Sequence, residues 1–477
     1  MFNNIDPTYC RRLVAAAFAL LFSCAPGRGA TSTNGSTWLA QPLSLTECLN
    51  IALDQNGSVL KSKKDLEATH GVVVQTRAIA MPKVRVSGSY SVSDEGSVER
   101  IKFPTIPGVS GLTGIEPGDQ NWSANIRLVQ SIYEGGRIRS ALRTARLSRE
   151  QAFCLHQTVV ADVALEVRVA FYDVLLAAQQ IVVNEASLDL LNKELEDTKR
   201  RFAAGTVPNF NVLRAEVERD NAKPRLIRAR NAYRIAKSTL VNLLGYHVPS
   251  DVWEDIPLQL NGSLETEKFT IEMPAALAHA RERRPELAAL RKTEDLRKEG
   301  VANAKAGYLP SVQAYTGYGS HNSSFSSDLS RDISGWQVGV QVGWDLFDGE
   351  LTRGKVSQAR ALQEKAQIET DDTTRRIELE VRTAFSSLIE AWEVLESQEK
   401  VQEQAKEALR LAQARADAGT GTQLDVLGAQ TALTEARTTK ILAQRDYAVA
   451  RARLERAIGD FVPRPSGEEA KVASPKP

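Results

Sequence analysis

WSANIRLVQSIYEGG at residues 122–136 returns 214 positions further along the chain as WQVGVQVGWDLFDGE at residues 336–350. The correspondence continues without a gap, matching Ala170-Phe171 with Ala384-Phe385, Gly205-Thr206 with Gly419-Thr420, Tyr233 with Tyr447 and Gly245 with Gly459. Solenoid repeats have periods of roughly 20 to 50 residues, so a period this long indicates the duplication of a large supersecondary unit. The fold is therefore predicted to be one unit built twice.

Each unit contains two stretches in which apolar and polar residues alternate. They are residues 83–93 and 122–132 in the first unit, and residues 312–318 and 336–344 in the second. Alternation predicts strands with one apolar and one polar face, and about ten residues suffice to cross a bilayer when tilted. The polar face carries Lys83, Arg85 and Arg127, and tryptophans lie at strand ends. This pattern favours a membrane barrel with a watery interior over a half-buried soluble sheet.

Each strand pair is followed by a helix pattern of unusual length, at residues 137–204 and 352–418, without an internal proline. At 1.5 Å per residue either helix would be roughly 100 Å long, which does not fit a compact core. Apolar residues recur at alternating spacings of three and four, as in a coiled-coil seam. The seam consists of Val160, Val163, Val167, Phe171, Val174, Ala178 and Ile181, and of Ile377, Val381, Ala384, Leu388, Trp392 and Leu395. A second helix then runs back to Gly245 or Gly459, so each unit is predicted to hold a long helical hairpin.

These patterns divide the chain into five parts. The predicted parts are a signal peptide (1–30), a first repeat unit (31–245, with strands in 83–132 and a helical hairpin in 137–245), a connector (246–284), a second repeat unit (285–459, with strands in 311–347 and a helical hairpin in 352–459) and a disordered polar tail (460–477).

The N-terminus has the pattern of an export signal. Arg11-Arg12 precede an apolar run from Leu13 to Phe22, which is too short to span a bilayer. Leu21-Phe22-Ser23-Cys24 is similar to a lipoprotein cleavage site, although Phe22 is bulkier than usual there. Two readings stay open, lipidation of Cys24 or ordinary cleavage near residues 27–30.

Composition argues against several classes of protein. The 60 basic and 59 acidic side chains leave a formal net charge of +1, so no overall field favours nucleic acid. The histidines and cysteines lack metal-ligand spacing, and no nucleophile or paired-carboxylate motif stands out. Neither an enzyme nor a cofactor or metal site is predicted. A disulfide between Cys48 and Cys154 is left open.

Several short motifs resemble those of the outer-membrane efflux protein (TolC-like) family over nearly all of the mature chain. They are YEGG (133–136) with FDG (347–349), RRFAAGTVPNFNVLRAE (200–216) with ARADAGTGTQLDVLGAQ (414–430), and RPEL (284–287). The resemblance implies a homotrimer with a twelve-stranded outer-membrane β-barrel and a periplasmic α-helical tunnel. It also implies passive export through a duct that meets a periplasmic adaptor and an inner-membrane pump, with drugs, metals or proteins as cargo. The alternative is an exported coiled-coil scaffold of the cell envelope, which would not need alternating strands.

The resemblance also places functional residues at the two helical hairpin turns. The residues expected to meet the adaptor are Phe202, Gly205, Thr206, Val207, Gly419, Thr420 and Gly421. Asp425 is expected to line the tunnel entrance, where three copies would form an acidic ring. A purely structural interpretation remains for each: the glycines are natural helix caps, and Thr422 with Asp425 has the spacing of a capping box.

Overall fold

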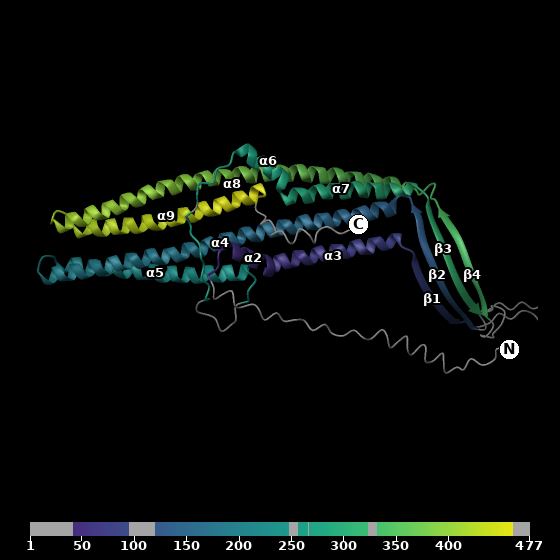
Figure 1. Cartoon of the computed structure of the whole chain (residues 1–477), viewed down its shortest axis with the longest axis horizontal. Helices are drawn as coiled ribbons and strands as arrows, with labels where there is room; N and C mark the ends of the chain where they lie inside the picture. Colours follow the sequence, from purple (N-terminus) through teal and green to yellow (C-terminus); the bar gives the residue numbers. More distant parts are fainter. Residues whose placement is uncertain (1–41, 95–119, 248–255, 266, 323–331, 461–477) are drawn as a thin grey trace, which may run out of the picture.

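The computed structural model describes residues 42–94, 120–247, 256–265, 267–322 and 332–460. The chain is elongated, with a sheet at one end and two helical hairpin turns at the other (Figure 1). The predicted signal peptide with Cys24, and the tail after residue 460, lie outside the described residues. Within these ranges, no helix combines the length and the apolar run that a membrane span requires.

The sheet is formed by one β-hairpin from each repeat. β1 (Lys83–Val92) pairs with β2 (Gln120–Glu134), and β3 (Ser311–Asn322) pairs with β4 (Asp332–Gly343). β2 and β3 pair with each other, so the order is β1-β2-β3-β4 and every pairing is antiparallel. β1 and β4 are left as edge strands, each with one unpaired row of backbone hydrogen-bonding groups.

The apolar side chains of this sheet lie on one face, as the alternation predicts, and that face is uncovered. Val86, Ile126, Trp336 and Val340 are 72%, 52%, 79% and 63% exposed. Soluble monomers rarely expose contiguous apolar patches of this kind, so the face is built to contact an apolar environment.

The fourth strand ends earlier than its sequence pattern suggests. Trp344 continues the alternation, but β4 stops at Gly343, whose register partner Ser311 is the first residue of β3. Pro310, which lacks an N–H, precedes Ser311. The indole Nε1 of Trp344 donates to the carbonyl oxygen of Tyr308 at 3.1 Å instead. The prediction that Trp344 belongs to the strand is therefore wrong.

The long helices match their predicted ranges to within a residue. α4 (Arg137–Ala203) and α8 (Leu351–Asp417) each have 67 residues, and their return helices are α5 (Asn209–Leu243) and α9 (Gln423–Ile458). Most of the predicted seam is buried, including Val167, Phe171 and Val381. Ala178 is only partly buried, and Ala177 lies in the core in its place.

Shorter helices extend each hairpin towards the sheet. α2 (Leu45–Gln55) and α3 (Gly57–Ala80) precede β1, while α6 (Met273–Arg283), α7 (Pro285–Lys305) and a 3₁₀ turn (Ala306–Tyr308) precede β3. In Figure 1, α5 and α3 follow one another along α4, and α9 and α7 follow one another along α8. α4 also contacts α7 and α9, so the two repeats pack side by side.

Two apolar cores lie where the short helices meet the long ones. One surrounds Phe171 and Leu240 and joins α2, α4 and α5, and the other surrounds Tyr447 and Leu454 and joins α6, α8 and α9. Gly245 follows the C-terminal end of α5 and has a φ of 82°. A Cβ at this position would lie 2.4 Å from the carbonyl oxygen of Gln55. This glycine is therefore required both by its left-handed backbone and by the close approach of α2.

Candidate functional site

The two hairpin turns at the helical end share the hydrogen bonds made by their glycine and threonine residues. Gly205 and Gly419 are left-handed, with φ of 75° and 73°. The Thr206 N–H and hydroxyl both donate to the carbonyl oxygen of Arg201, at 3.0 and 2.8 Å. Thr420 bonds to Arg415 in the same way, at 2.9 and 3.3 Å. Each threonine therefore satisfies a carbonyl that the end of its long helix leaves free.

The turns also differ in their exposed side chains. Phe202 and Phe210 are 45% and 67% exposed on the first turn, and Val207 is half-buried. The second turn is tighter, because a Cβ on Gly421 would lie 2.9 Å from the Cβ of Arg415. Leu424, the equivalent of Phe210, is 52% exposed on the second turn, where Ala416 stands in place of Phe202. The first tip therefore carries two exposed aromatic side chains, and the second is compact with one exposed leucine.

The structure brings the two turns together, which the sequence did not predict. Arg201 forms an ion pair with Asp417 across the ends of α4 and α8, at 3.1 Å. The Gln423 amide, at the start of α9, donates to the Thr198 hydroxyl and to Glu194 on α4. These contacts connect the ends of the two hairpins within one chain.

Asp425 forms the capping box that its spacing allowed. Its carboxylate accepts from the Thr422 hydroxyl and N–H at 2.7 and 3.0 Å, and its own N–H donates to the Thr422 hydroxyl. The hydrogen bonds from the side chain and backbone of Thr422 lower the pKa of Asp425, so the group is charged at neutral pH. Since the carboxylate is exposed, capping leaves it accessible to solvent.

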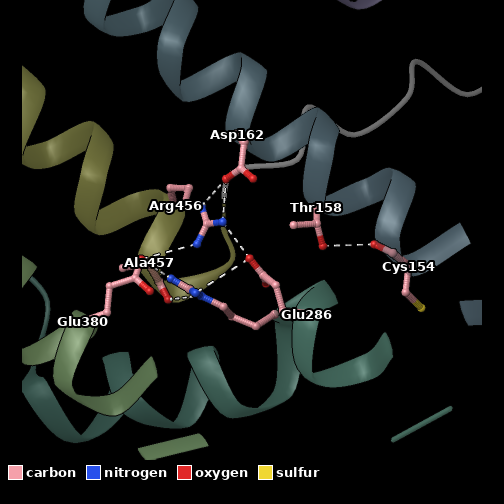
Figure 2. Close-up of polar contacts among 8 residues, drawn as sticks. Cys154, Thr158, Asp162, Glu286, Glu380, Arg456 and Ala457 are labelled. Atoms are coloured by element: carbon pink, nitrogen blue, oxygen red, sulfur yellow. Dashed lines mark hydrogen bonds and ion pairs between the residues drawn. The ribbon is translucent and has the colours of Figure 1, made fainter. Parts of the chain in front are cut away.

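A charged cluster lies midway along the molecule, where four helices meet (Figure 2). Arg456 on α9 donates to Asp162 on α4 at 2.5 Å, to Glu286 on α7 at 2.6 Å and to Glu380 on α8 at 3.4 Å. Burial favours a lower pKa for Arg456, but attraction to Glu286, Asp162 and Glu380 outweighs it, so the pKa is raised. One side chain thus connects both repeats.

The RPEL motif contributes to the same cluster. Arg284 is 3% exposed; it donates to the Ala457 carbonyl oxygen at 2.9 Å and to Glu380 at 2.5 Å. Pro285 occupies the first turn of α7, and Leu287 is buried in the core. Sequence reasoning found the motif but not Arg456, because its acidic partners come from three different helices.

The family model for outer membrane efflux proteins matches residues 48–246 and 276–460. The chain belongs to the outer membrane efflux protein family. It is similar to the outer membrane protein TolC of Escherichia coli, with 23% identity over 442 residues, covering 90% of this chain and 84% of TolC. It is also 26% identical over 321 residues to the alkaline protease secretion protein AprF of Pseudomonas aeruginosa, covering 67% and 65% of the two chains.

Solved structures in this family share the fold. The Campylobacter jejuni CmeC outer membrane channel superposes with a TM-score of 0.73 at 15% sequence identity, covering 90% of this chain and 88% of CmeC. The chain is therefore an outer-membrane exit duct of an efflux or type I secretion system, with its helices in the periplasm. The predicted family and location are confirmed.

Cys48 and Cys154, whose pairing the sequence left open, are both free thiols. Burial raises the pKa of Cys48 to about 12, which makes it an unreactive core residue.

Proposed function

We propose that three copies of the chain close a twelve-stranded barrel and a continuous helical tunnel, through which cargo passes without chemistry by the duct itself. The observation that carries this proposal is the sheet, with two open edges and an uncovered apolar face. Open edges cannot be satisfied in lipid, and only closure removes them. Pairing β1 of one copy with β4 of the next supplies that closure.

The helices support the same arrangement. Large apolar residues stay exposed on α3, α4 and α8, and Val182 on α4 is 65% exposed. Val74 on α3 and Ile368 and Leu379 on α8 are 55%, 66% and 65% exposed. Neighbouring copies would cover these surfaces in a ring. The two hairpin turns would then form the periplasmic end, where a periplasmic adaptor and an inner-membrane pump dock.

A disulfide between the edge strands tests closure directly. Two intervening strands separate β1 and β4 by roughly 14 Å, beyond the Cα separation of about 7 Å that a disulfide spans. A bond between these strands can therefore form only between copies. We would place Cys at Ser87 and, in separate variants, at Gln337, Gly339 and Gln341, in a Cys154→Ser background. Ser87→Cys with Asn125→Cys is the matched control, because these two residues are register partners within one copy.

The expected product is covalent dimer and trimer for one of the three registers, with nothing larger, and monomer for the control. A ladder beyond trimer would indicate an open filament, and monomer alone in all registers would contradict the barrel. An exported coiled-coil scaffold predicts the latter result and no conductance in a planar bilayer.

A further inference from the structure

A basic groove lies on the polar face of the sheet. It has a volume of about 760 Å³, and its lining includes Lys83, Arg85, Arg127, Tyr315 and several glycines. Gly335 leaves open space where another residue would place a Cβ, whereas a Cβ at Gly317 or Gly319 would meet β2, at 2.8 Å from the Ile126 carbonyl oxygen or 2.4 Å from the Asn125 Oδ1. The basic side chains of the groove come from the first hairpin, and its glycines and Tyr315 come from the second hairpin.

The positive charges are close together and lack nearby carboxylates on the strands. Arg85 lies directly opposite Arg127 in the register, an arrangement of like charges that destabilises a sheet. Among the described strand residues only Glu134 and Asp332 are acidic. Glu134 pairs with Ser311, six positions along β3 from the partner of Arg127, or roughly 20 Å. By alternation Asp332 belongs to the apolar face, at the far end of β4.

The second repeat shows that the sheet does not need these charges. Arg85 is the third residue after Pro82, and Gln313 is the third after Pro310. Gln341 corresponds to Arg127 in the duplication, and Gln313 lies directly opposite Gln341. The same cross-strand position thus holds two arginines in one hairpin and two glutamines in the other. Neutral amides fit the position, so the arginines have a use other than folding.

Contacts of Tyr315 hold one of these arginines over the groove. The Arg127 guanidinium lies 4.5 Å from the centre of the Tyr315 ring. That ring leans over Gly339, where an added Cβ would lie 2.6 Å from the tyrosine Cζ and Oη. Arg127 is thereby directed towards the second hairpin, with its donors available to a ligand.

We propose that this groove is an anion site inside the barrel, which attracts solutes with several phosphate or carboxylate charges. The inference rests on the proposed trimer, in which three cations per copy give nine around the lumen. At about 0.1 M salt the Debye length is about 10 Å, and near 0.01 M it is about 30 Å. The site therefore acts on any solute that passes along the wall, and across the lumen at low salt.

Single-channel recording in a planar bilayer tests this site, with pyrophosphate added on the side of the sheet. Arg85→Gln with Arg127→Gln installs the residues that the second repeat already has. Arg85→Lys with Arg127→Lys is the matched control, because it keeps the charge at both positions. In the Gln variant, the pyrophosphate concentration that halves the current should rise about tenfold, and the reversal potential in a KCl gradient should shift towards cations. Both effects should be largest at low salt.

The Lys variant should keep the block and the reversal potential of the wild type. Normal channels of the Gln variant with unchanged block would overturn the inference and leave the trimer intact. Loss of block in the Lys variant equal to that in the Gln variant would also overturn it, since charge would not be the cause. Failure of the wild type to form channels would overturn the trimer proposal and this inference together.

Discussion

Gly136 and Glu350 occupy the same position in the two repeats and both have left-handed backbone, with φ of 90° and 66°. Each is the residue just before a long helix, α4 or α8. Among the described residues, Glu350 is the only non-glycine with positive φ. The duplication has thus preserved the backbone of this turn while losing the residue that adopts it without strain.

Glu350→Gly should therefore stabilise the protein. Relief of left-handed strain is worth about 1 kcal/mol, against a few tenths for the exposed Glu350–Arg353 ion pair that is lost. Thermal unfolding in detergent, followed by circular dichroism, measures the change. Gly136→Ala is the control and should destabilise by a similar amount, because an added Cβ there meets no atom within 4 Å and only the backbone is strained. A lower melting temperature for Glu350→Gly would contradict this account.

Arg456→Met should be strongly destabilising. It leaves Asp162 without its cation, and leaves Arg284 as the one remaining partner of Glu286 and Glu380 in the cluster. Breaking a fully buried pair costs about 3–5 kcal/mol, and the partial exposure of Asp162 and Glu380 reduces this to about 2–3 kcal/mol. The melting temperature should fall clearly, and limited proteolysis should open the middle of the helical region.

Arg456→Lys is the matched control for charge. Lysine restores the positive charge, but its ammonium group cannot bond to three carboxylates as the planar guanidinium does. The melting temperature of Arg456→Lys should therefore lie between those of the wild type and Arg456→Met. Equal stability of Arg456→Met and the wild type would show that the cluster contributes nothing to holding the repeats together.

The two faces of the sheet should differ sharply in their tolerance of charge. Val86→Arg places a cation on the apolar face and should cost about 2–4 kcal/mol near the bilayer midplane. Ile126→Arg and Val340→Arg should behave alike. Ser87→Arg and Gln341→Arg are the matched controls on the polar face and should be mild. Trimer yield in outer-membrane fractions measures the difference, and equal yields for both faces would exclude a barrel.

Much of the fold could be predicted because the sequence patterns are long and occur twice. The 214-residue repeat and the unbroken apolar seams determine α4 and α8 to within a residue. Alternation located the strands but not their ends. It shows on which face of the sheet each side chain lies, whereas a strand ends where the neighbouring strand offers no further backbone hydrogen-bond partner. Contacts between repeats, such as Arg201 with Asp417 or Arg456 with Asp162, leave no local signal, because each joins residues far apart in sequence.

The hairpin turns give separable predictions for docking and for capping. Thr206→Trp and Thr420→Trp remove a hydroxyl that caps a helix and also add bulk where the adaptor is proposed to meet the duct. Thr206→Ser and Thr420→Ser keep the hydroxyl without bulk and serve as matched controls. If the turns dock the adaptor, the Trp variants should abolish export in cells while trimers remain intact in the membrane. Loss of trimers in the Trp variants would mean that the turns are only structural.

Asp425 combines a capping role that the structure shows with an entrance role that we propose. In a trimer, three copies of this exposed carboxylate would surround one axis and favour cations. The first repeat has Asn211 at the equivalent position and Pro208 in place of Thr422, so it neither adds a carboxylate nor repeats the side-chain cap. The folded pKa of Asp425 is lowered, so the stability from its cap is present above the unfolded pKa and is lost as the pH falls through the folded pKa.

Asp425→Asn separates the two roles, because asparagine keeps the size and much of the hydrogen bonding while three charges per trimer are removed. If the ring exists, cation selectivity and block by multivalent cations from the helical side should both fall, with little change in melting temperature. Thr422→Val is the matched variant that removes the capping hydroxyl and leaves the charge, so it should lower the melting temperature and keep the selectivity. Unchanged selectivity of well-formed Asp425→Asn channels would leave Asp425 with its capping role alone.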